Sequence, residues 1–160
     1  MKALFTRGKA LNWAGVKEDL ITWGLEQPVS HVGLMFNNGQ VIHSTWAGVE
    51  VIPYDKFVEC REIMAVIDHE LTDEEENEVF SAASEYEYKQ YDWLFLFKLI
   101  LQVIANKLGF GKVEYWKSWD LPQALICHEI YEIVPEDYRP KKDLSKAATP
   151  FELYLLLEGE

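Results

Sequence analysis

The side chains with the clearest chemical potential in this chain are a thiol and two imidazoles. The chain has two cysteines and four histidines, and Cys127, His31 and His43 are the set that could work together. A cysteine attacks a carbonyl carbon after a nearby base has taken its proton, and the ring of that base needs a third group to hold it. His31 and His43 are twelve positions apart, so they can cooperate only if the fold brings them to one surface.

Whether the two histidines meet depends on the register of a predicted hairpin. Residues 32–36 and 41–46 alternate in character as strands do, and Asn37-Asn38-Gly39 between them is a strong turn signal. A loop of two residues would place His31 and His43 on opposite faces of the strand pair. A loop of three residues would make them diagonal neighbours on one face.

The loop of three residues fits the sequence better. It pairs Gly33 with His43 and Leu34 with Ile42, and it puts Gly39 at the position that favours left-handed backbone. Gly33, which has no side chain, then leaves room for something to approach the two rings. The apolar side chains gather on the other face of the hairpin, namely Val32, Leu34, Phe36 and Ile42.

The remaining pattern predicts an α+β fold, with a small antiparallel sheet packed on helices. A capping box at Thr72–Glu75 opens a helix that is expected to run to about Tyr88. Thr149 caps a final helix that is expected to end near Leu157. Further strands are expected at 4–5, 49–52 and 63–67, and further helices at 16–23, 92–108 and 121–134, the last of which carries Cys127.

Length and composition limit the classes of function. A chain of 160 residues with 49% hydrophobic residues forms one domain, over 1–160, and the net charge of −12 argues against nucleic acid or anionic membranes as partners. Two cysteines are too few for a disulfide scaffold or a Cys-rich zinc site. No apolar segment of the secretory kind follows the first ten residues, so we expect a cytoplasmic protein.

The segment 93–110 is the longest apolar stretch, but it is too short and too polar to cross a membrane. Within it, the helix over 92–108 has one narrow polar stripe. It is either a core helix or the wall of an apolar substrate site. In the second case Trp93 and Phe97, together with Trp46 beyond the second histidine, are the predicted substrate-binding residues.

Several segments, taken in order, resemble one known group of enzymes. They are Ser30–Leu34, Val41–His43, Val49–Phe57, Gln90–Asp92, Ile126–Glu129 and Thr149-Pro150. The ordered set resembles the circularly permuted NlpC-type papain-like hydrolases, above all the YiiX-like bacterial proteins and the lecithin:retinol acyltransferase-like enzymes. In that group the strands that carry histidine precede the helix that carries cysteine, as they do here.

The resemblance implies a permuted papain-like fold and a thiol hydrolase, an amidase or peptidase that acts on peptides or cell-wall peptides. It makes Cys127 the nucleophile, His31 the general base and His43 the group that orients His31. An ester or lipid acyl hydrolase or acyltransferase is the alternative on the same fold. The resemblance implies no cofactor or metal, and it points to a bacterial or phage-encoded protein.

Other interpretations of the same residues stay open. A buried strand histidine and a helical cysteine are often structural, and the fold can serve as a non-enzymatic binding module. Zinc bound by the two histidines with Cys127 and His128 is a third hypothesis, although the spacing matches no standard pattern. His69 is expected to be an exposed loop residue, and Cys60 a structural one.

Overall fold

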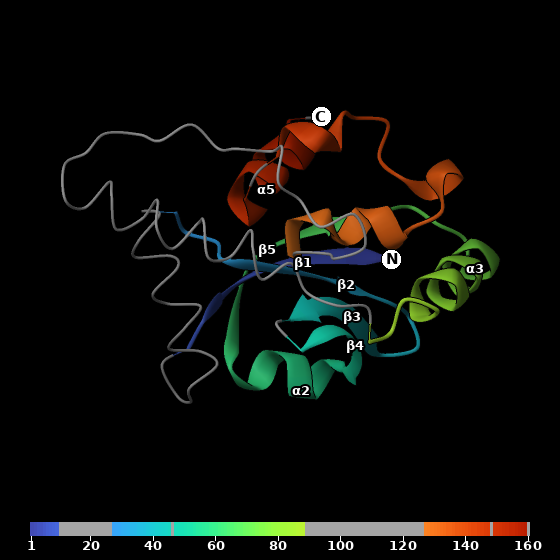
Figure 1. Cartoon of the computed structure of the whole chain (residues 1–160), viewed down its shortest axis with the longest axis horizontal. Helices are drawn as coiled ribbons and strands as arrows, with labels where there is room; N and C mark the ends of the chain where they lie inside the picture. The colour runs from blue at the N-terminus through green and yellow to red at the C-terminus, as the bar shows by residue number, and fades with distance from the viewer. Residues whose placement is uncertain (10–26, 46, 89–126, 148, 160) are drawn as a thin grey trace.

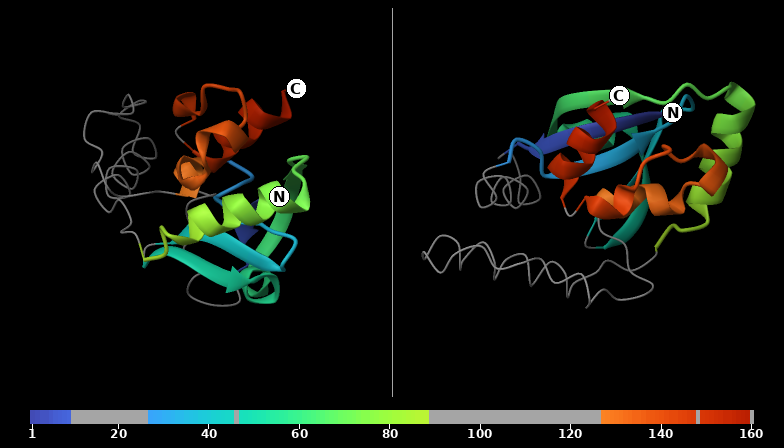
Figure 2. Two further views of the ribbon diagram at one scale, coloured as in Figure 1. Left: turned by 90° about the vertical axis from the view of Figure 1, so that its right-hand side faces the viewer. Right: turned by 90° about the horizontal axis from the view of Figure 1, so that it is seen from above.

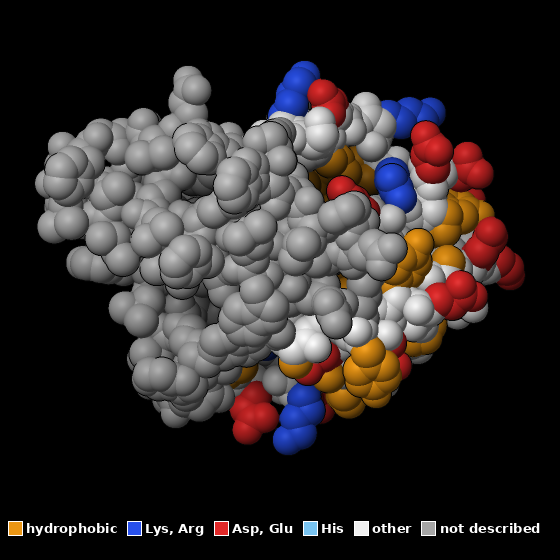
Figure 3. Space-filling view, viewed as in Figure 1, with side chains coloured by type: hydrophobic (Ala, Val, Ile, Leu, Met, Phe, Trp, Pro, Cys, Tyr) orange, Lys and Arg blue, Asp and Glu red, His pale blue; other side chains and the backbone are white. Residues whose placement is uncertain are grey.

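The computed structural model describes residues 1–9, 27–45, 47–88, 127–147 and 149–159. Two of the expected helices, over 16–23 and 92–108, lie outside these residues. Among the described helices, none has the length and apolar character needed to cross a membrane. In the described part, acidic side chains are spread over the surface on the side of the helix at 73–84 (Figure 3).

A five-stranded antiparallel sheet forms the centre of the fold (Figure 1). Its strands lie in the order β4-β3-β2-β1-β5, and every neighbouring pair is antiparallel. Each expected strand is present, and the α+β class is confirmed at that level. The strands are β1 (Lys2–Gly8), β2 (His31–Met35), β3 (Gln40–Thr45), β4 (Gly48–Pro53) and β5 (Arg61–Asp68).

The β2–β3 hairpin has the predicted three-residue loop. Gly33 pairs with His43 and Leu34 pairs with Ile42. Gly39 has a φ of 78°, in the left-handed region, and its N–H donates to the Phe36 carbonyl at 2.9 Å. The loop length therefore places both histidines on one face of the sheet.

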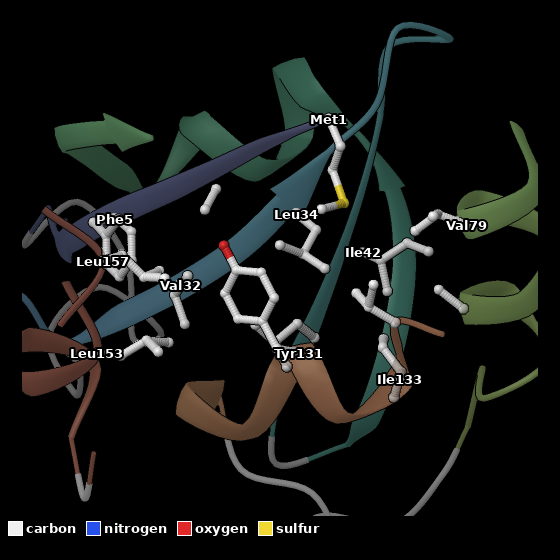
Figure 4. Close-up of a cluster of buried hydrophobic side chains, with 14 of the residues drawn as sticks. Met1, Phe5, Val32, Leu34, Ile42, Val79, Tyr131, Ile133, Leu153 and Leu157 are labelled. Atoms are coloured by element: carbon white, nitrogen blue, oxygen red, sulfur yellow. The ribbon is translucent and has the colours of Figure 1, made fainter. Parts of the chain in front are cut away.

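The larger hydrophobic core lies on the other face. There the apolar side chains of the hairpin meet the 3-10 helix η2 (Cys127–Ile133), α3 (Asp73–Ser84) and α5 (Pro150–Glu158). Tyr131 and Ile133 of η2 point toward the strands (Figure 4). The core members drawn from the strands and helices include Phe5, Val32, Leu34, Ile42, Val79, Ile130, Leu153 and Leu157.

The histidine face is covered by a short helix that the sequence pattern did not predict. This helix, α2 (Tyr54–Glu59), lies on the opposite side of the sheet from η2 and α5 (Figures 1 and 2). Its one buried side chain, Phe57, joins Leu4 and Val41 in a second, smaller core cluster. The sheet thus separates two packing layers, and the histidines belong to the α2 layer.

Helix boundaries differ from the expectation in one place and agree in another. The capping box is present, since the Thr72 hydroxyl accepts from the Glu75 N–H and the Glu75 carboxylate accepts from the Thr72 N–H. However, α3 ends at Ser84 instead of near Tyr88. The Tyr88 N–H donates to the Val49 carbonyl of β4 at 2.8 Å, and Tyr88 has a φ of 68°. This bond to β4 turns the chain away from the helix axis.

The C-terminal helix begins as predicted, because the Thr149 hydroxyl accepts from the Glu152 N–H at 3.2 Å. The described part of the helix expected over 121–134 is the 3-10 helix η2. Two further 3-10 turns, η3 (Glu136–Tyr138) and η4 (Leu144–Lys146), connect η2 to α5.

Candidate functional site

His31 and His43 form a direct contact beneath α2. Nε2 of His31 lies 3.0 Å from Nδ1 of His43, and the ring planes are nearly perpendicular, at 89°. The two residues are buried, with exposed fractions of 5% and 1%. The predicted placement of the two histidines on one face is therefore confirmed, and their rings are in contact.

Both rings are neutral at pH 7. Burial, followed by the positive charge of Arg61, lowers the pKa of His43 to about 3. The same causes, with a further contribution from His43, hold the pKa of His31 well below its usual value of 6.5. Since each neutral ring carries one proton, one ring donates and the other accepts in the 3.0 Å bond.

The space beside Gly33 is filled by the protein itself. A Cβ atom at Gly33 would lie 3.0 Å from Cε2 and Cζ of Phe57. The Phe57 ring also lies 6.0 Å from the His31 ring and 5.2 Å from the His43 ring, measured between centroids. The room that Gly33 leaves beside the rings is therefore occupied by Phe57. The missing side chain at Gly33 lets α2 approach the sheet.

Arg61 fixes this arrangement from β5. Its guanidinium lies over the Phe57 ring, 4.8 Å from the centroid, and donates to the Phe57 carbonyl at 3.2 Å. Arg61 is itself buried. Phe57 is thereby held between the charge of Arg61 and the two neutral imidazoles.

Replacement of Gly33 by alanine is expected to lower the free energy of unfolding by about 1–3 kcal/mol, because the added methyl group overpacks the contact with Phe57 and Val41. The measurement is urea denaturation of the wild type and Gly33→Ala. A second variant that combines Gly33→Ala with Phe57→Leu should recover part of the loss, since the smaller side chain makes room. If the losses of unfolding free energy in Gly33→Ala and Phe57→Leu simply add up in the double variant, the two residues do not interact and the explanation is wrong.

Glu50 is a charged neighbour of the pair that sequence reasoning missed. It pairs with His43 across β3 and β4, and its Oε2 lies 3.6 Å from Nε2 of His43. The Glu50 side chain is 39% exposed. The signal was available, because the turn at Ala47-Gly48 fixes the register that puts Glu50 opposite His43.

The structure does not describe the side chains of the predicted nucleophile or of the predicted substrate-binding residues. Cys127 belongs to η2, but its side chain and that of His128 lie outside the described residues, as do Trp46, Trp93 and Phe97. The described side chains of η2 that are buried pack into the larger core, on the face opposite the histidines. The structure therefore brings together His31 and His43 of the predicted site.

The other histidine and cysteine in the described residues have structural surroundings. Cys60, which the sequence predicts to be structural, is buried directly after α2. His69 is not the exposed residue that was expected, since it is half-buried and its Nε2 lies 2.5 Å from the Tyr131 hydroxyl. Burial raises the pKa of Tyr131. Across the described ranges, no three His, Cys, Asp or Glu side chains gather to hold a metal ion.

Fold and site together define an α+β protein in which a central antiparallel sheet and a short helix enclose a neutral histidine pair. Comparison of the chain with protein-family models, curated proteins and solved structures finds no match in any of the three. The residues and their geometry are therefore the basis for a functional proposal.

Proposed function

We propose that the chain is a cysteine hydrolase in which His31 is the general base, His43 orients it and Cys127 is the nucleophile. The observation that carries the proposal is the 3.0 Å contact between Nε2 of His31 and Nδ1 of His43. This contact uses one ring nitrogen of His31, so Nδ1 is the nitrogen that can take up a proton. A base held through its far nitrogen is the arrangement that thiol activation needs.

The neutral state of the pair leaves a lone pair on His31 that can accept a proton in the first step. Nδ1 of His31 accepts the proton of the Cys127 thiol while the sulfur forms a bond to the carbonyl carbon of the substrate. The oxyanion collapses and the leaving group takes the proton back from His31, which gives an acyl-enzyme. Water then attacks that thioester, with His31 again as the base, and the acid product leaves the restored thiol.

Two features support the assignment of Cys127. It belongs to η2, which contacts β2 and β3, the two strands that carry the histidines, from the other face of the sheet. His31 is also the first residue of β2, so the base lies at one end of the central strand. A thiol that approaches Nδ1 would do so at that end.

The bond cleaved is most simply an amide in a peptide or cell-wall peptide, as the resemblance to permuted NlpC-type hydrolases implies. The net charge of −12 favours neutral or cationic substrates over strongly anionic ones. Hydrolysis or transfer of an acyl group from an ester or lipid uses the same steps, with a second acceptor in place of water.

One observation favours a second candidate, a non-enzymatic binding module. The buried side chains of η2 lie across the sheet from the histidines, and Phe57 covers the pair on its own face. With this geometry His31 and His43 act as a buried structural contact, and the function lies elsewhere on the surface.

Thiol labelling and hydrolysis distinguish the two candidates. For an enzyme, iodoacetamide should label Cys127 faster than Cys60 at pH 7, and His31→Ala should slow the labelling of Cys127 by about tenfold. The intact chain should cleave stem-peptide amides or fatty-acyl esters, Cys127→Ala should cleave neither, and the matched variant Cys60→Ala should keep the activity. Equal, slow labelling of both cysteines together with no cleavage would favour the binding module.

A further inference from the structure

We propose that Glu50 is a positioning residue that sets the proton order along His43 and His31, so that Nδ1 of His31 carries the lone pair. The use of that lone pair as a base rests on the function proposed above. The proton order itself is a property of the folded chain and can be measured without any substrate.

The first step is the proton on His43. Its Nε2 is buried and has no hydrogen-bond partner among the described residues, and the carboxylate of Glu50 lies 3.6 Å away. A ring N–H that faces a carboxylate is attracted to it, whereas a ring lone pair in the same place is repelled. Glu50 therefore favours the form of His43 that has its proton on Nε2.

The second step transfers this preference to His31. When the His43 proton is on Nε2, its Nδ1 can only accept. The 3.0 Å contact then requires a proton on Nε2 of His31. A neutral imidazole has one proton, so Nδ1 of His31 is left with its lone pair. The opposite order, with Nδ1 of His43 as the donor, would put the proton of His31 on Nδ1 and remove the base.

The other charged group beside the pair leaves this choice to Glu50. Arg61 on β5 lowers the pKa of both histidines after burial itself, so it opposes a second proton on either ring and keeps both neutral. Phe57, which covers both rings from α2, offers no carboxylate or carbonyl in its side chain. Because Glu50 is partly exposed, water screens its charge. The remaining attraction is too weak to add a second proton to His43, but it is strong enough to favour one of the two neutral forms of the ring.

The test is the ring-nitrogen NMR spectrum of the full chain at pH 7, labelled with 15N at histidine. In the wild type we expect the proton on Nε2 in both His31 and His43. In Glu50→Gln the averaged 15N chemical shifts of both rings should move together toward the tautomers that have the proton on Nδ1. The population ratio of the two tautomers should change by about fivefold, the effect of a partly screened charge. Substitution of each histidine in turn assigns the signals.

The matched control is Glu59→Gln, which removes the same charge from α2, where Glu59 contacts Lys56 at 3.5 Å. It should leave both rings unchanged, and Glu50→Asp, which keeps the charge, should stay near the wild type. A proton on Nδ1 of His43 in the wild type, or equal effects of Glu50→Gln and Glu59→Gln, would overturn the proposal. A chain with the expected proton order but no hydrolase activity would overturn only the proposed function.

Discussion

Replacement of Glu76 by glutamine is expected to lower the free energy of unfolding by about 3–5 kcal/mol, the usual cost when one partner of a buried ion pair is removed. The Met1 ammonium lies 2.5 Å from Oε2 of Glu76, and the two side chains are 0% and 4% exposed. The other carboxylate oxygen accepts from the backbone N–H of Asn37. Glutamine can still accept one bond, but it leaves the buried ammonium without a countercharge.

Urea denaturation at pH 7 measures this effect, and Glu74→Gln is the matched control. Glu74 is an exposed residue in the same first turn of α3. Its replacement removes one negative charge at nearly the same position along the helix, so it should change the stability by less than about 0.5 kcal/mol. Similar losses in Glu74→Gln and Glu76→Gln would show that the helix charge, and not the buried pair, is responsible.

Acid is expected to destabilise the fold steeply below about pH 6.5, because His31 and His43 take up protons in the unfolded chain but not in the native one. The native pKa of His43 is about 3 and that of His31 is well below 6.5. The unfolded state therefore binds more protons as the pH falls, and stability falls with it. Two such groups cost about 3 kcal/mol between pH 6.5 and pH 5.

His43→Gln separates this contribution from that of the carboxylates. The variant keeps one of the two buried histidines. The histidine contribution to the slope of its unfolding free energy against pH should therefore be about half that of the wild type. Above pH 7 neither protein takes up protons on these rings, and the two curves of unfolding free energy against pH should run parallel. Equally steep curves below pH 6.5 would show that His43 is protonated in the native state.

Local rules were sufficient to locate the strands and to place the two histidines on one face, but they did not give the order of the strands in the sheet. Strand alternation located β1 to β5, and the left-handed position of Gly39 set the loop length. From the loop length follows the register of Gly33 with His43, and hence the shared face of His31 and His43. This part of the site was predictable because each step involves residues that are close in sequence.

Helix α2, which covers His31 and His43, was not predictable from local rules. α2 has only six residues, and its N-cap is Pro53, which makes no side-chain cap. A helix this short has little stability of its own and depends on tertiary packing. Its packing comes from Phe57, which fits against Gly33 and under Arg61. Because this contact joins three separate segments, the sequence indicates that Gly33 leaves room beside the rings but not that Phe57 occupies it.

Long-range partners account for the other differences. The end of α3 is set by the bond from Tyr88 to Val49, and the burial of His69 is set by the Tyr131 hydroxyl. Glu50 could have been found by extending the hairpin register over one more strand. Its role would still have required the 3.6 Å distance to His43, which only the folded chain provides.

β1 is the first strand in the chain but occupies an inner position in the sheet, between β2 and β5. β2, β3 and β4 follow one another through short turns within residues 31–53, so they can pair early and at little entropic cost. The β1–β5 pair joins Lys2 to Asp68 and must close a far longer loop. Folding rates fall as contacts become less local. We therefore expect the β2–β4 meander, with its two histidines, to pair before β1 and β5 complete the sheet.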